Sequence, residues 1–96
     1  MTTEREMPKY QSHKQVHALQ IELIVPDEEV AARESRETDG GAWIYPADEG
    51  YAPFKVNRAY VEKHYPKAGG YYVVYADGYE SWSPREAFEQ GYTRIE

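Results

Sequence analysis

The sequence contains no cysteine. This absence excludes disulfide bonds, a thiolate nucleophile and a cysteine-ligated zinc site. Long hydrophobic runs are also missing, because no stretch approaches the roughly 20 apolar residues that span a bilayer. Residues 1–11 are polar and contain no apolar signal-peptide core. We therefore expect a cytoplasmic protein with no membrane partner.

A basic surface is lacking as well. The net charge is -6, and all of it comes from residues 26–50, where two arginines stand against eight carboxylates. The segments on either side are electrically neutral. A protein that binds duplex nucleic acid neutralises phosphates with a dense basic face. The charge distribution therefore argues against duplex DNA or RNA as a partner.

The mean hydropathy of -0.87 is low enough to suggest disorder. Yet aromatic residues make up 15% of the chain and ten of them are tyrosines, which are polar on such scales but bring large rings to a core. Disordered chains are poor in aromatic residues. A length of 96 residues suits a single domain over residues 1–96.

The first half of the chain indicates three strands and an ambiguous acidic segment. Residues 14–25 alternate with a period of two, which predicts a long strand with its odd positions on one apolar face, ended by Pro26. Residues 26–41 fit either a mobile acidic loop or a short helix capped by Asp27, and the scarcity of apolar residues favours the loop. Residues 42–45 and 54–56 read as short strands.

The second half has clearer local signals. Asn57 is a good cap for a short helix that Pro66 stops. Residues 71–75 and 79–82 are rich in strand-forming residues, and Asp77-Gly78 between them favours a two-residue hairpin turn. That turn would place Val73 opposite Trp82 on the buried side.

Ser83-Pro84-Arg85-Glu86 follows as a capping box with proline at the first helical position. Gly91 is placed to end that helix, and residues 92–95 can form a last strand. The predicted fold is therefore α+β, a small single domain in which an antiparallel sheet with a C-terminal β-hairpin is joined by two short helices.

The C-terminal third also carries a resemblance. The run YYVVYADGYESWSP over residues 71–84, followed by Ala87-Phe88-Glu89 and Gly91-Tyr92-Thr93, resembles the C-terminal half of small uncharacterised phage and prophage accessory proteins. Residues 12–18 look like the start of their first strand, whereas the acidic residues 26–50 depart from them. The resemblance implies a phage accessory gene acting in the host-cell cytoplasm, and it transfers no catalytic residue.

Catalytic chemistry finds no support in the sequence. His13 and His17 would lie roughly 13 Å apart on a strand, which is too far for one metal ion, and His64 has no companion. Ser81 and Ser83 lack a nucleophile-elbow motif, and no phosphate-binding glycine loop is present. We expect no catalytic residue, no metal and no cofactor.

Two surfaces are candidates for binding. Tyr72 and Tyr79 should share the outer face of the hairpin, and with Tyr51 they could form an exposed aromatic patch of the kind enriched at interfaces. Arg58 and Lys67 could bring cationic groups to that patch. The second candidate is an acidic surface, which could attract a basic protein. Its carboxylates are Glu28, Glu29, Glu34 and Glu37.

Three interpretations of function follow. The first is a phage-type accessory protein that binds a host protein non-covalently, in the manner of a counter-defence factor, and the carboxylates favour it. The second is a sponge that sequesters a host nucleotide signal, with tyrosines stacking on bases and basic side chains on phosphate. The third is a virion or assembly protein that works as a homo-oligomer, since short strands leave sheet edges to be paired.

Overall fold

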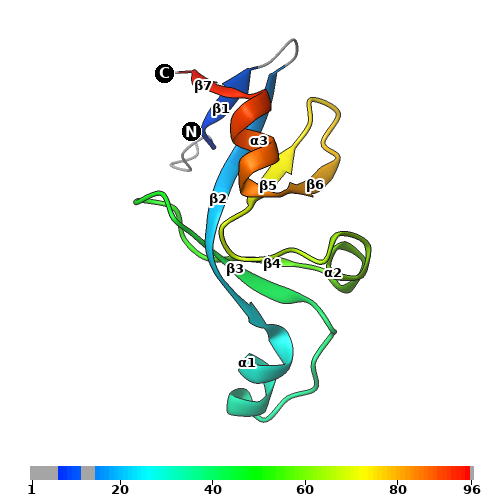
Figure 1. Cartoon of the computed structure of the whole chain (residues 1–96). Helices are drawn as coiled ribbons and strands as arrows, with labels where there is room; N and C mark the ends of the chain where they lie inside the picture. The colour runs from blue at the N-terminus through cyan, green and yellow to red at the C-terminus, as the bar shows by residue number, and fades with distance from the viewer. Residues whose placement is uncertain (1–6, 12–14, 96) are drawn as a thin grey trace, which may run out of the picture.

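The computed structural model describes residues 7–11 and 15–95. These ranges form seven strands and three short helices, so the predicted α+β class and antiparallel sheet are confirmed (Figure 1). In chain order the elements are β1 (Lys9–Gln11), β2 (Gln15–Pro26), α1 (Asp27–Glu34), β3 (Ala42–Pro46), β4 (Phe54–Val56), α2 (Arg58–His64), β5 (Tyr71–Val74), β6 (Glu80–Ser83), α3 (Arg85–Gly91) and β7 (Thr93–Ile95).

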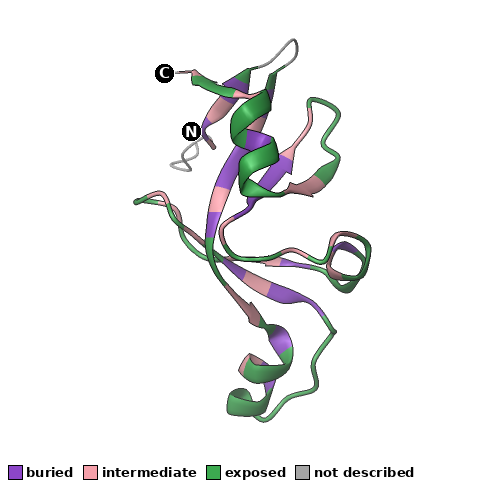
Figure 2. Ribbon diagram, in the orientation of Figure 1, coloured by how far each residue is buried: buried purple, intermediate pink, exposed green. Residues whose placement is uncertain are grey.

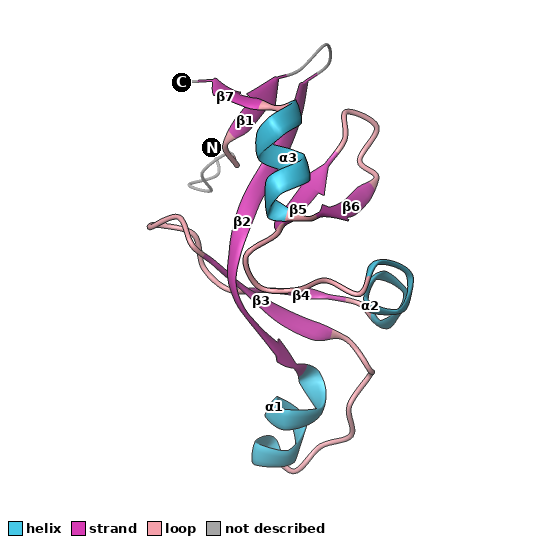
Figure 3. Cartoon of the chain, viewed as in Figure 1, coloured by secondary structure: helices cyan, strands magenta, loops and turns pink. Residues whose placement is uncertain are grey.

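The long strand β2 organises the sheet, as Figure 3 shows. Its first residues pair with β1, and residues 17–20 pair with β5, which in turn pairs with β6. Its last residues pair with β3, which pairs with β4. We call β1, β5, β6, β7 and the first half of β2 the upper sheet, and β3, β4 and the second half of β2 the lower sheet.

Two buried clusters hold these halves together (Figure 2). In the upper cluster, Phe88 of α3 is 1% exposed and packs on the upper sheet. In the lower cluster, Tyr60 of α2 is 5% exposed and packs on the lower sheet. Strand β5 serves both clusters, because Tyr71 and Val73 belong to the upper one and Tyr72 to the lower one. Both faces of this strand are therefore covered.

The predicted strand over residues 14–25 is confirmed as β2, although Lys14 lies outside the described residues. The prediction of one continuous apolar face was wrong. Val16 and Ala18 face the upper cluster and Ile21 faces the lower one. A β-bulge between Ile21 and Leu23 then changes the alternation. Ile24 consequently packs against the lower cluster, while Leu23 is left 50% exposed.

The hairpin of β5 and β6 forms where the sequence predicted it, but its register differs by one residue. Tyr72, rather than Val73, lies opposite Trp82. The loop has three residues instead of two, because Tyr75 N–H donates to Tyr79 C=O (3.0 Å) and Gly78 N–H to Tyr75 C=O (2.8 Å). Gly78, with φ of 90°, supplies the left-handed position of such a loop. This shift of one residue exchanges the two faces of β6 relative to β5.

Two helix-start predictions had different outcomes. The Asn57 side chain accepts a hydrogen bond from Tyr60 N–H at 2.8 Å, so the predicted cap of α2 is confirmed. The Ser83 cap was wrong, because Ser83 belongs to β6 and α3 starts at Arg85 with Pro84 in the cap position. The first helical hydrogen bond runs from Phe88 N–H to Pro84 C=O, one residue later than the capping box implies.

Two further elements differ from what the sequence favoured. Residues 9–11 form β1, which pairs with both β2 and β7, and Tyr10 in it is buried. Residues 27–34 form α1 at the lower end of the molecule, which is the short helix given as the alternative to the favoured mobile loop (Figure 1). The reason for this second difference lies in polar contacts rather than in an apolar face. The predicted Asp27 cap was wrong, because Pro26 holds the cap position and no side chain caps the helix.

Candidate interaction surfaces

Asp27, at the junction of β2 and α1, has no exposed surface. Its carboxylate accepts hydrogen bonds from both terminal nitrogens of Arg36, at 3.1 and 2.9 Å. Thr38 Oγ1 and Trp43 Nε1 donate to it as well, each at 2.9 Å. A buried carboxylate is tolerated when its oxygens are paired and hydrogen-bonded in this way. Asp27 therefore fixes α1 and the loop that follows it to β3.

Asp39 is a second paired carboxylate at the lower end of the molecule. Asp39 pairs with Lys55 Nζ at 2.6 Å and accepts a hydrogen bond from Gly41 N–H at 2.9 Å. Lys55 also lies 3.7 Å from Asp27. Hydrogen bonds from Arg36 and Trp43 hold the pKa of the Asp27 carboxyl well below its usual range, and the Lys55 hydrogen bond lowers the pKa of Asp39. These contacts order residues 27–41 without a large apolar face.

The four carboxylates predicted for the acidic surface are all exposed. Glu28, Glu29 and Glu34 lie on α1, and Glu37 lies on the loop after it. Glu34 pairs with Arg36 at 2.8 Å. The structure thus separates the acidic segment into a buried anchor, Asp27, and an exposed set. The sequence signal for the anchor was an aspartate directly after the proline that ends a long strand.

The predicted aromatic patch does not form as expected. Tyr72 is 7% exposed, because Tyr60 of α2 and Phe54 of β4 cover its face of β5, and its hydroxyl donates to Glu80. Burial raises the pKa of the Tyr72 hydroxyl, and the Glu80 contact adds to that effect. Tyr79 is 41% exposed and stacks on Tyr75 with ring centroids 5.8 Å apart. Of the two rings predicted to form an exposed patch, one is therefore buried and the other is exposed.

Tyr79 instead borders a groove of about 340 Å³ between α2 and the hairpin loop. Lys63 Nζ lies 5.0 Å from the centre of the Tyr79 ring, and the His64 ring lies 6.0 Å from it. At the back of the groove, the Tyr60 hydroxyl donates to Ser81 C=O at 2.7 Å. The Lys63 ammonium and the Tyr79 ring therefore already contact one another at this groove.

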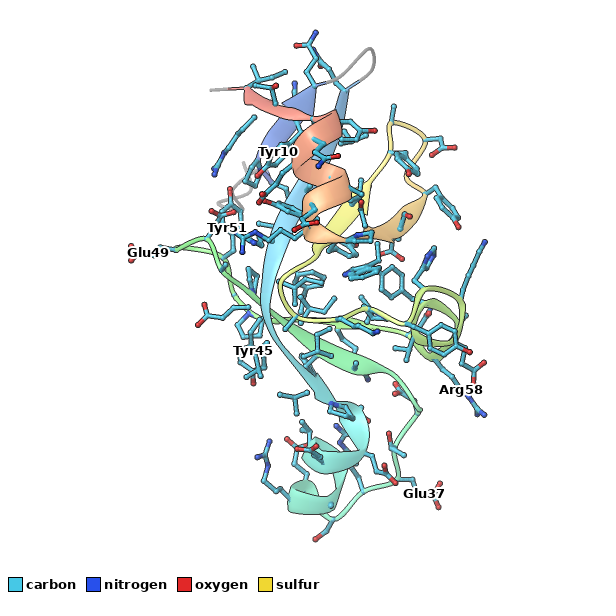
Figure 4. All side chains as sticks on the ribbon, viewed as in Figure 1. Tyr10, Glu37, Tyr45, Glu49, Tyr51 and Arg58 are labelled. Atoms are coloured by element: carbon cyan, nitrogen blue, oxygen red, sulfur yellow. The ribbon has the colours of Figure 1, made fainter. Side chains whose placement is uncertain are left out.

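The other predicted binding residues are dispersed. Arg58, Lys67 and Tyr79 each line a different surface groove. Figure 4 places Tyr51 on one side of the molecule and Arg58 on the other. Arg58 also pairs with Glu62 at 2.8 Å. The structure therefore does not bring these five residues together into one ligand site.

Sequence reasoning missed the exposed apolar residues of the lower sheet. Leu23 of β2 is 50% exposed and Tyr45 of β3 is 37% exposed, and they are direct partners across the two strands. Tyr65, 70% exposed, lies elsewhere, at the end of α2. The signal that could have identified Leu23 is a bulge, and a bulge has no reliable mark in a single sequence.

The described part of the chain contains neither a candidate metal site nor a membrane-spanning helix. Among residues 7–11 and 15–95 there is no group of three or more His, Cys, Asp or Glu side chains that could hold a metal ion, and His13 lies outside these ranges. No helix in the same ranges is long and apolar enough to cross a membrane. What the surface offers is acidic and apolar contact area.

Comparison with known proteins gives a structural neighbour but no matching family model. No family model matches the chain. No curated protein sequence matches it. Among solved structures, the fold is similar to that of a phage structural protein, the phage L decoration protein, whose monomeric form was solved by NMR. The two share 26% sequence identity with a TM-score of 0.63, over 96% of this chain and 62% of that one. The chain therefore corresponds to somewhat less than two thirds of its neighbour.

Proposed function

We propose that this protein is an accessory component of a phage virion that attaches non-covalently to the assembled particle. The observation that carries the proposal is the structural similarity to a phage decoration protein over 96% of the chain. Of the three interpretations drawn from the sequence, the virion or assembly role has this support. The host-factor and nucleotide interpretations rest on the sequence alone.

The surface described above agrees with a role in binding. The exposed carboxylates of α1 and the exposed pair Leu23 and Tyr45 give the lower end both charge and apolar area. A protein that attaches to an assembled particle needs a contact surface rather than a catalytic centre. Self-association of the chain, part of the virion interpretation, stays a prediction.

The test uses particles of the phage whose genome carries this gene, prepared with the gene deleted. Purified protein should co-sediment with these particles, and binding should saturate at a fixed number of copies per particle. Particles of an unrelated phage provide the control. Protein that stays in the supernatant at every concentration would contradict the proposal. A host protein would then be the next partner to test.

A further inference from the structure

The lower sheet has two faces of different character. Ile24, Ala42 and Ile44 point into the lower cluster. Their neighbours along the strands point the opposite way, because side chains alternate across a strand. On this second face Leu23 lies opposite Tyr45, and Val25 lies opposite Trp43. We call these four residues the outer face.

The outer face is apolar yet incompletely covered. Leu23 is 50% exposed and Tyr45 is 37% exposed, while Val25 and Trp43 are half-buried. The bulge next to Leu23 is the cause, since it turns apolar residues outward at the point where β2 enters the lower sheet. Helix α1 extends beyond the end of these strands in Figure 1 and leaves Leu23 and Tyr45 open. Adjacent exposed apolar residues with a polar border are typical of interaction sites.

Acidic residues border this face along the chain. Glu22 lies in the bulge beside Leu23, and Glu28 and Glu29 occupy the first turn of α1, just after β2 ends. All three are exposed. In Figure 4, Tyr45 and Glu49 project from the same side of the molecule. One cation lies on this face, since Lys55 is the strand partner of Trp43 and its Nζ is 5.5 Å from the centre of that ring, but it is already paired with Asp39. The border is therefore negative.

We propose that the outer face is the docking surface for a protein partner whose contact area is apolar and bordered by lysine or arginine. Charge complementarity decides the occupant. A second copy docking through a two-fold axis would bring two identical surfaces together. Each copy would bring its exposed Glu22, Glu28 and Glu29 to the border of the contact, and like charges across an interface are unfavourable. A basic-bordered partner removes that repulsion and covers Leu23 and Tyr45.

Because this assignment rests on the proposed attachment to a phage particle, the first experiment measures particle binding by outer-face variants. The double variant Leu23→Ser/Tyr45→Ser should weaken binding by about tenfold or more, since central apolar contacts dominate interface affinity. The matched control is Tyr65→Ser/Tyr79→Ser, which removes two exposed aromatic residues elsewhere and should leave affinity within about twofold. Circular dichroism checks that both variants fold.

Equal binding by Leu23→Ser/Tyr45→Ser and wild type would overturn the docking surface while leaving particle attachment intact. If the wild type does not bind particles, the proposed function fails, and a probe that needs no particle decides the docking surface. That probe is a synthetic peptide of alternating leucine and lysine, and a leucine–glutamate peptide is its control. NMR shift changes should centre on Leu23, Val25, Trp43 and Tyr45 for the lysine peptide only. Changes centred elsewhere, or none, would overturn the assignment.

The competing occupant is tested by sedimentation of the protein alone. A monomer across the concentration range agrees with a basic-bordered partner. Self-association that Leu23→Ser/Tyr45→Ser abolishes, and Tyr65→Ser/Tyr79→Ser does not, would identify a second copy as the occupant and overturn the partner proposed here.

Discussion

At the scale of single residues, Asp27 matters most for the lower end of the molecule. One carboxylate collects donors from a helix-following loop and from strand β3, at distances of 2.9 to 3.1 Å. Removing such a group leaves Arg36 and the Trp43 indole without their acceptor, which is costly because unpaired buried polar groups are not compensated. Its neighbour Glu28 is exposed and should be replaceable.

Asp27→Asn should therefore lower the free energy of unfolding at pH 7 clearly more than Glu28→Gln does. The pH dependence follows from the depressed pKa of Asp27, whose largest cause is the Arg36 hydrogen bond. Above the unfolded value of about 3.9 both states are ionised. As pH falls below that value, the unfolded chain takes up a proton and the folded one does not, so stability is lost.

Denaturant titrations between pH 7 and pH 3 check this expectation. The stability advantage of wild type over Asp27→Asn should be constant down to about pH 5 and should shrink toward pH 3. An advantage that stays constant to pH 3 would show that the charge of Asp27 contributes nothing and that its hydrogen bonds do not require ionisation.

At the scale of elements, Phe88 is the buried side chain through which α3 packs on the sheet. The Phe88 ring stacks on Tyr71 and Tyr92, with centroids 4.3 and 4.7 Å away, and meets Tyr10 edge-on at 4.8 Å. Tyr10 belongs to β1 and Tyr71 to β5. Phe88 therefore joins three segments that lie far apart in the sequence.

Phe88→Ala should cost about 3–5 kcal/mol of unfolding free energy, the range for deleting a buried aromatic ring. The matched control is Gln90→Ala, which alters an exposed position on the same helix and should change stability by less than about 0.5 kcal/mol. Denaturant titration measures both variants. A loss below about 1 kcal/mol for Phe88→Ala would mean that α3 contributes little to the upper cluster.

At the scale of the whole molecule, exposed acidic residues gather at one end. The molecule measures 45 × 32 × 23 Å, and α1 with its exposed carboxylates lies at one end of it in Figure 1. Two of the segment's carboxylates, Asp27 and Asp39, are internally paired with Arg36 and Lys55. What solvent meets at this end is therefore the glutamate set on α1 and its loop.

If that end approaches a basic surface first, association with the phage particle should slow as salt rises, because exposed charges are screened beyond about 8–10 Å. Glu28→Gln/Glu29→Gln should reduce the association rate more than it raises the dissociation rate, since charges at the border of an interface act mainly on encounter. Glu62→Gln/Glu86→Gln removes two exposed carboxylates elsewhere and is the control. Equal association rates for the two double variants in stopped-flow measurements would contradict this role.

Several parts of the fold could be predicted because their signals are local. The two-residue alternation over residues 15–25 depends on neighbouring side chains, and so does the Asn57 cap, which reaches only to Tyr60. The hairpin could be located from Asp77-Gly78, but its register could not. A two-residue and a three-residue loop use the same glycine, and the choice between them depends on whether Trp82 packs on the upper or the lower cluster.

The candidate surfaces were less predictable because they depend on contacts between distant residues. The amino-acid sequence by itself determined that the protein is acidic, lacks cysteine and carries its net charge in one segment. Only the tertiary structure decided that Asp27 is buried, since Thr38, Trp43 and Lys55 meet it only after β3 and β4 pair. Likewise, only the pairing of β2 with β3 reveals the bulge that exposes Leu23, since simple alternation would place Leu23 on the same face as the buried Ile21.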